Sequence, residues 1–280
     1  MKVAVTGAKG MLGRALSARL SALGHQTLPL DLPEHDLLDF PAVQAYLQAA
    51  APDFIYNCAA FTNVDLCETE YASARAVNAL AVGNLAGSAR TLQIPLLQIS
   101  TDYVFSGMAD KPYLPETPPA PLSAYGRTKA EGELLAQTTD KYFIVRTAWL
   151  YGQHGKNFVE TIIKLAGTQP VLKVVNDQRG APTLVDDLVA VLLLFLDCRE
   201  YGIYHFTNSG ETTWYGFAQE FLRLLHIETK LEPCATAEFP RPARRPAYSV
   251  LDLTKTRSLF KIAVPDWRDA IARYCQNRKG

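Results

Sequence analysis

A glycine-rich turn directly after the first apolar run constrains the fold of this chain more than any other feature. Residues 2–6 read Lys-Val-Ala-Val-Thr and are followed by Gly7, Gly10 and Gly13, after which a helical pattern begins. In such a turn the first glycine permits the tight bend, the second lets the backbone approach a pyrophosphate, and the third lets helix and strand pack closely. The helix N-terminus would then present free N–H groups and a positive dipole end to the phosphates. The pattern predicts a dinucleotide-binding unit at the start of the chain.

Short apolar runs alternate with longer segments of helical period in the first half of the chain. We expect strands at 2–6, 26–30, 54–56, 95–100 and 142–147, and helices at 11–23, 41–49, 71–92 and 123–137. This alternation is typical of βαβ units, in which each helix crosses over a parallel sheet. The sequence therefore predicts an α/β fold with a Rossmann-type, doubly wound parallel sheet.

The pattern is looser in the second half, which we expect to hold a smaller lobe. Helices are predicted at 157–166, 184–196, 214–225 and 266–275, with short strands near 172, 204 and 230. We divide the chain into a dinucleotide-binding domain, 1–152, and a mixed α/β substrate-binding lobe, 153–280, with segments near 157–215 completing the sheet. The proline-rich stretches 111–121 and 238–247 are loops, either surface connections or ordered loops beside the site.

Composition excludes several classes of protein. The chain of 280 residues has 28 Lys and Arg against 28 Asp and Glu, so it lacks the basic excess that favours nucleic acid or an anionic membrane. Its five cysteines are scattered and never form a C-x-x-C pair, which fits a reducing cytoplasm and indicates neither a disulfide framework nor a zinc site. The longest apolar run, 188–196, is too short to span a bilayer and reads as a buried helix. We expect a cytoplasmic monomer or homodimer.

An acidic residue at the end of the second predicted strand bears on the choice of cofactor. Asp31 could hold the adenosine ribose hydroxyls and would then favour NADH. Lys9 and Arg14 could instead pair with the 2'-phosphate of NADPH, so both cofactors stay open. Further on, Asp39 and Phe40 could supply a carboxylate and an apolar face for adenine, or Asp39 could cap the helix that follows.

A second group of residues carries acid–base chemistry. Tyr125 and Lys129 are four residues apart on a predicted helix, which places the phenol and the ammonium on one face. A nearby cation stabilises phenolate, so we expect Lys129 to lower the pKa of Tyr125 and ease proton transfer to a substrate oxygen. Thr101 follows the fourth predicted strand, and ligands of open α/β sheets lie outside the carboxyl ends of the strands.

These residues together resemble the extended short-chain dehydrogenase/reductase superfamily. More narrowly, the segments Asn57–Asp65, Ser100–Phe105, Arg146–Gly152 and Asn176–Thr183 look like the dTDP-4-dehydrorhamnose reductase family. The similarity runs from Lys2 to about Trp267, and the last two segments are specific to that branch.

The resemblance implies a reduction of the C4 keto group of a nucleotide-linked 4-keto-6-deoxy sugar by NADPH or NADH. Tyr125 would protonate the developing alkoxide, Lys129 would hold the nicotinamide ribose, and Thr101 would hydrogen-bond the carbonyl oxygen. The predicted cofactor-binding residues are Gly7, Gly10, Met11, Leu12, Gly13, Asp31, Asp39, Phe40, Ala60, Phe61, Thr62, Tyr125 and Lys129.

The predicted substrate-binding residues come from both halves of the chain: Thr101, Asp102, Trp149, Asn176, Gln178, Arg179 and Arg245. Asp102 is a candidate for a sugar hydroxyl or a structural cap, and Trp149 offers a flat face for sugar or nicotinamide or packs in the core. Arg245 could pair with a diphosphate or be a solvated loop arginine.

One family feature is missing from the sequence. Some family members are described as joining through Mg²⁺ held by glutamates, one of them just past the glycine turn, where this chain has Arg14, Ala15 and Leu16. We therefore predict no metal site.

Two other functions compete with the reductase. A sugar-nucleotide 4,6-dehydratase or 4-epimerase would share the fold and the Tyr-Lys pair, but a dehydratase of that pattern has an Asp-Glu pair where Asp102 is followed here by Tyr103. A non-catalytic subunit resembling the β subunit of methionine adenosyltransferase would keep the cofactor site without turnover, and the presence of Thr101, Tyr125 and Lys129 weighs against it.

Overall fold

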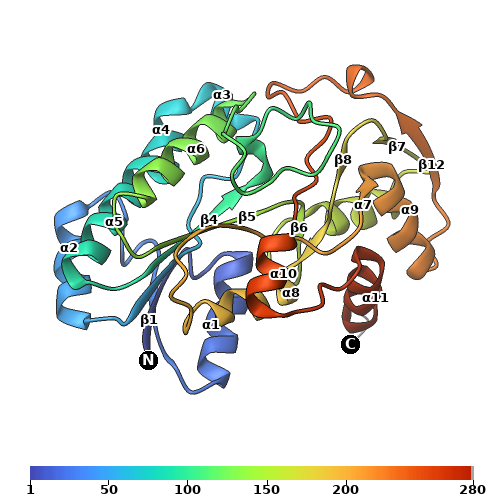
Figure 1. Cartoon of the computed structure of the whole chain (residues 1–280). Coiled ribbons are helices and arrows are strands. Elements are labelled where there is room, and N and C mark those ends of the chain that lie inside the picture. Colours follow the sequence, from blue (N-terminus) through green and yellow to red (C-terminus); the bar gives the residue numbers. More distant parts are fainter. Residues whose placement is uncertain (279–280) are drawn as a thin grey trace.

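A six-stranded parallel sheet forms the centre of the computed structural model, which describes residues 1–278 (Figure 1). The strands lie in the order β10-β5-β4-β3-β1-β2. Their bounds are β1 Lys2–Thr6, β2 Gln26–Leu30, β3 Phe54–Asn57, β4 Leu96–Thr101, β5 Tyr142–Thr147 and β10 Gly202–His205. The strand order reverses at β1, so a crevice opens there beyond the carboxyl ends of β1 and β3. The predicted α/β class and parallel sheet are confirmed.

Helices cover both faces of this sheet (Figure 1). One face carries α1 (Met11–Ala22) and α8 (Val185–Leu194), and the other carries α2 (Phe40–Ala50), α5 (Ala81–Leu92) and α6 (Ala124–Ala136). β1 shows why: Val3 and Val5 belong to the core on the first face, and Ala4 between them belongs to the core on the second.

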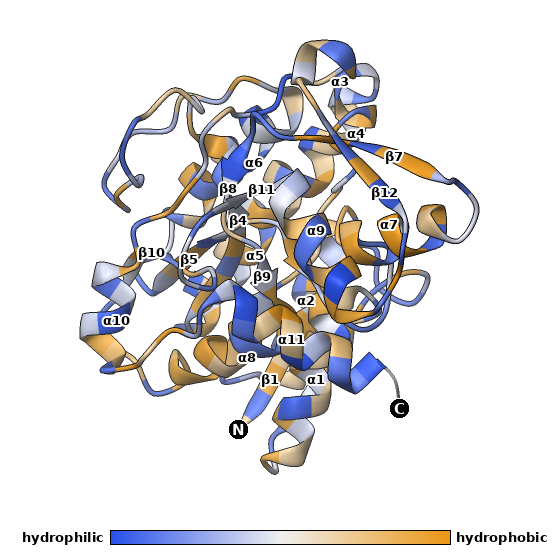
Figure 2. Cartoon of the chain, turned by 90° about the vertical axis from the view of Figure 1, so that its right-hand side faces the viewer, coloured by the Kyte–Doolittle hydropathy of each residue, from blue (hydrophilic) through white to orange (hydrophobic). Residues whose placement is uncertain are grey.

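A second lobe with its own apolar core is built from the later part of the chain. Here β7 (Val171–Val175) pairs in parallel with β12 (Lys230–Cys234), α7 (Phe158–Ala166) and α9 (Trp214–Leu224) pack against β7, and α11 (Trp267–Arg278) packs on α9 (Figure 2). Phe217 and Phe221 of α9 pack with Trp267 in this core. β10 of the main sheet, and α8, which packs on one face of that sheet, both come from beyond residue 152. The exact domain boundary stays a prediction.

Several short elements complete the fold. They are α3 Leu66–Thr69, η2 Asp102–Val104, β6 Leu150–Tyr151, β8 Arg179–Gly180, β9 Thr183–Leu184, β11 Thr212–Thr213, η3 Thr236–Glu238 and α10 Thr254–Phe260. β6 pairs with β9, and β8 pairs with β11. The chain therefore crosses from β5 into the second lobe through hydrogen-bonded segments.

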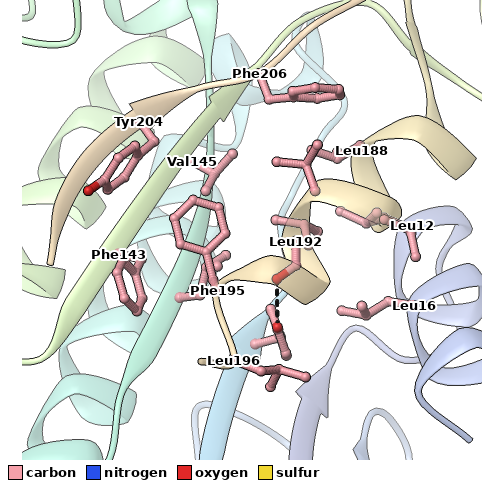
Figure 3. Close-up of a cluster of buried hydrophobic side chains, with 14 of the residues drawn as sticks. Leu12, Leu16, Phe143, Val145, Leu188, Leu192, Phe195, Leu196, Tyr204 and Phe206 are labelled. Carbon is pink, nitrogen blue, oxygen red and sulfur yellow. Dashed lines mark hydrogen bonds between the residues drawn. The ribbon is translucent and has the colours of Figure 1, made fainter. Parts of the chain in front are cut away.

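The apolar run near residue 190 forms part of a buried helix, as predicted. Figure 3 shows Leu188 and Leu192 of α8 between Leu12 and Leu16 of α1 on one side and the sheet on the other. The Tyr56 hydroxyl in β3 donates to the Leu192 carbonyl oxygen at 2.8 Å, the dashed line in the figure. This bond satisfies the polar end of a tyrosine that is fully buried. Among residues 1–278, no helix is both long and apolar enough to cross a membrane.

The segment 71–92 differs from its prediction as one helix. It consists of α4 (Tyr71–Arg75), a π-helical turn (η1, Ala76–Leu80) and α5. At the π turn, the backbone oxygen of Asn78 lies so close to Gly132 of α6 that any side chain at 132 would clash with it. A π turn inserts an extra residue into a helix, and such turns are frequent at functional sites. The prediction of a continuous α-helix is therefore wrong at 76–80.

A buried ion pair joins α6 to β5 behind the sheet's carboxyl edge. Arg146 and Glu133 are 1% and 2% exposed and form two hydrogen bonds, from Nε to Oε1 at 2.8 Å and from Nη2 to Oε2 at 2.7 Å. The Ser100 hydroxyl of β4 donates to the same carboxylate, and Arg146 Nη1 donates to the Pro115 carbonyl oxygen at 3.0 Å. The pair therefore fixes two strands, one helix and a proline-rich loop together.

Breaking this pair from one side should destabilise the protein strongly. Arg146→Met leaves the Glu133 carboxylate buried without its cation, so we expect the free energy of unfolding in urea to fall by about 3–5 kcal/mol. Adding Glu133→Leu removes the orphaned charge and should recover much of the loss. A single variant as stable as the double variant would show that the pair does not organise this region.

Candidate active site

A cleft of about 960 Å³ opens beyond the carboxyl ends of β1, β3 and β4. It brings together most of the predicted residues: Gly7, Gly10, Met11, Leu12, Gly13, Asp31, Ala60, Phe61, Thr62, Thr101, Asp102, Tyr125, Lys129 and Trp149. Because these residues come from separate parts of the sequence, their meeting in one cleft is a result of the fold. Asp39, Phe40, Asn176, Gln178, Arg179 and Arg245 do not line it.

The glycine turn forms one wall and leaves room for an anionic ligand. Gly7 has φ of +60°, and a Cβ there would lie 2.7 Å from the Ala59 nitrogen. A Cβ at Gly13 would clash with the Gly7 carbonyl oxygen. The N-cap of α1 is Gly10, which offers no capping side chain, and the first turn of α1 has no acidic residue. The turn thus presents uncapped N–H groups in a cleft of suitable size, which fits the pyrophosphate of a dinucleotide.

Asp31 lies in the cleft at the end of β2, held by two backbone N–H groups. Its Oδ2 accepts from Lys9 N at 2.7 Å, and its Oδ1 accepts from Leu32 N at 2.9 Å. The two cations considered for a 2'-phosphate are engaged elsewhere. Lys9 Nζ pairs with Glu34 at 2.8 Å, and Arg14 Nε donates to the Lys9 carbonyl oxygen at 2.7 Å.

The structure places Asp39 and Phe40 at the start of α2. The Asp39 carboxylate accepts from Ala42 N at 3.1 Å, so it caps the helix, and no strand precedes it within 31–39. The cleft is lined instead by the preceding Leu37 and Leu38. Of the two roles considered for Asp39, the structure shows the helix cap.

The segment after β3 is positioned by a residue that the sequence analysis missed. Asn78, buried in the π turn, accepts from Phe61 N at 2.8 Å and donates to the Phe61 carbonyl oxygen at 3.1 Å. It also donates to Thr128 Oγ1 of α6 at 3.1 Å. An asparagine within an otherwise apolar helical pattern could have indicated this role, because a buried side-chain amide needs hydrogen-bond partners. Asn78 therefore ties α6 to the wall of the cleft formed by Ala60, Phe61 and Thr62.

Lys129 lies at the floor of the cleft and is only 3% exposed. Its Nζ donates to the Ile99 carbonyl oxygen of β4 at 2.7 Å. Burial lowers the pKa of Lys129 to about 8, although the charge of Glu133 acts in the opposite direction. The ammonium is thus held at a fixed point beside the end of β4.

Tyr125 and Thr101 both line the cleft. Burial, and then the charge of Asp102, raise the pKa of Tyr125 well above its usual value, while a hydrogen bond with Thr101 lowers it. The predicted lowering of this pKa by Lys129 is wrong for the chain by itself, because Lys129 is not among the groups that act on the phenol. Tyr125 is therefore a protonated phenol at neutral pH, which is the form a proton donor requires.

Asp102 begins η2 and is 1% exposed, yet it lines the cleft. Its Oδ1 accepts from the Thr101 hydroxyl at 2.9 Å, while its Oδ2 is buried and makes no hydrogen bond of ordinary geometry with a described residue. Burial raises the pKa of Asp102 to about 6, against the opposing effects of the Ser249 and Thr101 hydroxyls. A buried carboxyl with a spare oxygen is uncommon enough to need an explanation.

Trp149 lines the cleft in an unusual backbone conformation. Its φ is +49°, and its ring stacks on Trp214 of α9 with centroids 3.6 Å apart and planes 10° from parallel. The Trp214 indole nitrogen donates to Gln178 Oε1 at 3.2 Å. The stack joins the cleft to the second lobe, and no sequence pattern indicated that Trp214 would take part.

The remaining predicted substrate residues lie in the second lobe and bond to protein groups. Asn176 Oδ1 accepts from Thr213 at 2.7 Å, Gln178 Nε2 donates to Thr236 at 2.9 Å, and Arg179 forms an ion pair with Glu211. Arg245 is not a solvated arginine, because both its Nη atoms donate to the Asp65 carboxylate, at 2.9 and 3.0 Å. The proline-rich loop 238–247 is thereby anchored beside α3. Burial raises the pKa of Asp65, but the hydrogen bonds from Arg245 and Ala243 N and the charges of Arg245 and Arg241 together leave that pKa below its usual value.

Among residues 1–278, no group of three or more His, Cys, Asp or Glu side chains is arranged to hold a metal ion. The cleft therefore combines a glycine turn at a helix N-terminus with a hydroxyl, a phenol and an ammonium, and it has no metal-ligand cluster among the described residues. A parallel sheet with this site defines an extended short-chain dehydrogenase/reductase.

Comparisons with known proteins identify the branch. The chain belongs to the dTDP-4-dehydrorhamnose reductase family: the family model described as RmlD substrate binding domain matches residues 1–279. A crystal structure of a dTDP-4-dehydrorhamnose reductase from Clostridium acetobutylicum is 42% identical, has a TM-score of 0.97, and covers 100% of both chains.

Two further relatives bear on cofactor and substrate. The Bacillus anthracis dTDP-4-dehydrorhamnose reductase, solved in complex with NADP, is 35% identical with a TM-score of 0.96 and covers 99% of both chains. A probable dTDP-4,6-dihydroxy-2-methyloxan-3-one 4-ketoreductase of Streptomyces antibioticus is 42% identical over 97% of this chain and 93% of its own. The predicted family is confirmed.

The thiol of Cys58, which lines the cleft, should be unreactive. Burial raises the pKa of Cys58 to about 12, so at pH 8 only about one molecule in 10⁴ carries the reactive thiolate. We expect folded protein treated with iodoacetamide at pH 8 to keep Cys58 unmodified in a peptide mass map, whereas unfolded protein is fully labelled. Rapid labelling of folded protein would contradict this environment.

Proposed function

We propose that this chain reduces the C4 keto group of dTDP-4-dehydro-L-rhamnose to give dTDP-L-rhamnose, with NADPH or NADH as reductant. The observation that carries the proposal is the meeting of the glycine turn with Thr101, Tyr125 and Lys129 in one cleft. The reductases from C. acetobutylicum and B. anthracis, which match over nearly full length, bear the same activity in their names.

The residues of the cleft divide between binding and proton transfer. The bound nicotinamide supplies the hydride. The glycine turn would hold the pyrophosphate and Asp31 the adenosine ribose, while Ala60, Phe61 and Thr62 would line the cofactor in the same cleft. Met11 and Leu12 contribute to the same wall. Lys129, fixed on the Ile99 carbonyl, would hold the nicotinamide ribose.

Tyr125 would donate its phenolic proton to the C4 oxygen as negative charge develops there. Thr101 would hydrogen-bond the same oxygen and so hold the carbonyl within reach of the phenol. Because burial keeps Tyr125 protonated, the proton is available throughout the neutral pH range.

The substrate would extend from the cleft toward the second lobe. Trp149 lines the cleft, and its ring, stacked on Trp214, would contact the sugar. Asn176, Gln178 and Arg179 lie farther along the same lobe, where they could contact the nucleotide. Arg245 could reach a diphosphate only by exchanging it for the Asp65 carboxylate.

The particular sugar is the finer part of the proposal. The S. antibioticus relative is named for a different dTDP-linked keto sugar, so the common substrate class is a dTDP-4-keto-6-deoxy sugar or a near analogue. The resemblance to the rhamnose branch favours dTDP-4-dehydro-L-rhamnose. We also propose that the protein works in the cytoplasm as a monomer or homodimer without nucleic-acid or membrane partners, and the buried, unbridged Cys67, Cys198 and Cys234 fit a reducing compartment.

Removing the phenolic proton should abolish most turnover. Tyr125→Phe keeps the ring but has no proton to give, so we expect kcat to fall by a factor of about 10² to 10⁴ while the Kd for NADPH changes little. The assay follows the loss of reduced-nicotinamide absorbance with enzymatically generated dTDP-4-dehydro-L-rhamnose.

Tyr103→Phe is the matched control, because this tyrosine packs edge-on against Tyr125, with ring centroids 5.5 Å apart, but does not line the cleft. Full activity of Tyr125→Phe would refute the mechanism. Formation of a 4-keto product from dTDP-glucose without reductant would instead favour a dehydratase. Absence of turnover with any keto sugar, together with co-purification of an adenosyltransferase, would favour the regulatory subunit.

The Asp31 carboxylate should control the choice between the two cofactors. A carboxylate at the adenosine ribose repels a 2'-phosphate, so Asp31→Ser should raise the ratio of kcat/KM for NADPH to that for NADH by about tenfold. Asp53→Asn removes a carboxylate whose Oδ2 accepts from Lys2 N far from the cleft, and should leave the ratio unchanged. An unchanged ratio in Asp31→Ser would show that this carboxylate does not face the ribose.

A further inference from the structure

The second lobe holds the ring of Trp149, the aromatic residue that lines the cleft. The backbone of Trp149 has φ of +49°, a left-handed conformation that bulky residues rarely adopt. Such a conformation persists only where the surroundings fix it, and examples cluster at ligand sites. The Trp149 carbonyl oxygen accepts from Thr183 N at 3.1 Å, which anchors the main chain. The ring has separate supports.

The paired strands β8 and β11 bring two of these supports together. Gly180 of β8 lies opposite Thr212 of β11, and Trp214 follows β11 directly. The Trp214 ring stacks on the Trp149 ring with centroids 3.6 Å apart. A Cβ at position 180 would lie 2.7 Å from Cε2 of the Trp149 indole, so a side chain there would collide with the ring. The two strands thus form a surface against which the Trp149 ring packs.

A buried amide fixes the orientation of Trp214. Gln178 is 5% exposed, and its Oε1 accepts from the Trp214 indole nitrogen at 3.2 Å. Its Nε2 donates to Thr236 Oγ1 at 2.9 Å, and the Thr236 hydroxyl donates to Asp177 at 2.6 Å. Both ends of the amide are therefore held by protein groups, and the indole that stacks on Trp149 is held with them.

We propose that Trp214 is a positioning residue for the substrate: oriented by Gln178, it holds the Trp149 ring where that ring contacts the sugar. This proposal rests on the proposed reductase function. Neither Trp214 nor Gln178 lines the cleft, so Trp214 acts on the sugar through Trp149. A ring that is already fixed loses little freedom when the sugar binds, whereas a released ring must be ordered at the expense of affinity.

Trp214→Leu removes the stack and is the main test. We expect the KM for dTDP-4-dehydro-L-rhamnose to rise by about tenfold, because Trp149 must then be ordered on binding, while kcat and the Kd for NADPH change little. Phe221→Leu is the matched control, since it alters a buried ring of the same helix whose ring neighbours are Phe158 and Phe217. The control should leave KM unchanged.

A cycle of double variants shows whether Trp214 acts through Trp149. In the Trp149→Leu background the ring to be positioned is gone, so adding Trp214→Leu should raise KM no further. Trp214→Phe keeps an aromatic face but loses the N–H group, and Gln178→Met removes the acceptor of the same hydrogen bond. These two variants should raise KM by similar amounts, about threefold, which is less than the effect of Trp214→Leu.

The ring positions can also be followed without turnover. The chain has three tryptophans, so protein labelled with 5-fluorotryptophan gives one ¹⁹F resonance for each, assigned by replacing each in turn. The Trp149 resonance is displaced by the ring current of Trp214, so it should shift and broaden in Trp214→Leu, while the Trp267 resonance changes little. Adding dTDP-L-rhamnose to the parent protein should move the Trp149 resonance.

The outcomes distinguish the possible failures. An unchanged KM in Trp214→Leu would overturn the proposal, and so would a rise that is equally large in the Trp149→Leu background. An equal rise in the KM of Phe221→Leu, or in the Kd for NADPH, would show that the whole lobe is disturbed and would also overturn it. If the parent protein reduces no keto sugar while dTDP-L-rhamnose moves the Trp149 resonance only when Trp214 is present, the reductase function fails and the positioning role stands. If Trp214→Leu does not fold, the KM values of Trp214→Phe and Gln178→Met decide.

Discussion

The position of the reacting groups depends on the buried Glu133–Arg146 pair. Glu133 lies one helical turn beyond Lys129 on α6, and the Ser100 hydroxyl that bonds to it precedes Thr101 on β4. One carboxylate therefore sets the register between the helix that carries the phenol and ammonium and the strand that carries the hydroxyl. The guanidinium also lies 4.8 Å from the Phe105 ring, so the same pair supports the turn after Asp102. A buried charge pair costs desolvation energy, and here it is retained where geometry must be exact.

Burial organises the chemistry as well as the fold. It lowers the pKa of Lys129 to about 8 and raises the pKa of Tyr125. Burial, and not an attraction between the two groups, therefore has the largest effect on both pKa values. The glycine turn works in the opposite sense, because it leaves helix N–H groups uncapped where an anion can satisfy them. The cleft thus joins a polar end for phosphates to a less solvated end for proton transfer.

Sequence reasoning succeeded where the information is local. The apolar run at 2–6 already predicts β1, and the glycine spacing predicts the turn that follows. The spacing of Tyr125 and Lys129 required only a helix. It failed where contacts are distant in the chain: the π turn at 76–80 packs closely against Gly132 of α6, and the ring that stacks on Trp149 is Trp214 of α9. The partner of Arg245 is Asp65 in the other lobe, and no local pattern predicts such a pair.

The most direct test of the account follows an isotope into the product. Purified protein is given dTDP-4-dehydro-L-rhamnose and reduced nicotinamide dinucleotide that carries deuterium at both C4 positions of the nicotinamide, and the product is analysed by NMR and mass spectrometry. The account predicts dTDP-L-rhamnose with one deuterium, located at C4 of the sugar. A product without deuterium, or deuterium at another carbon, would contradict direct reduction of the C4 carbonyl in this cleft.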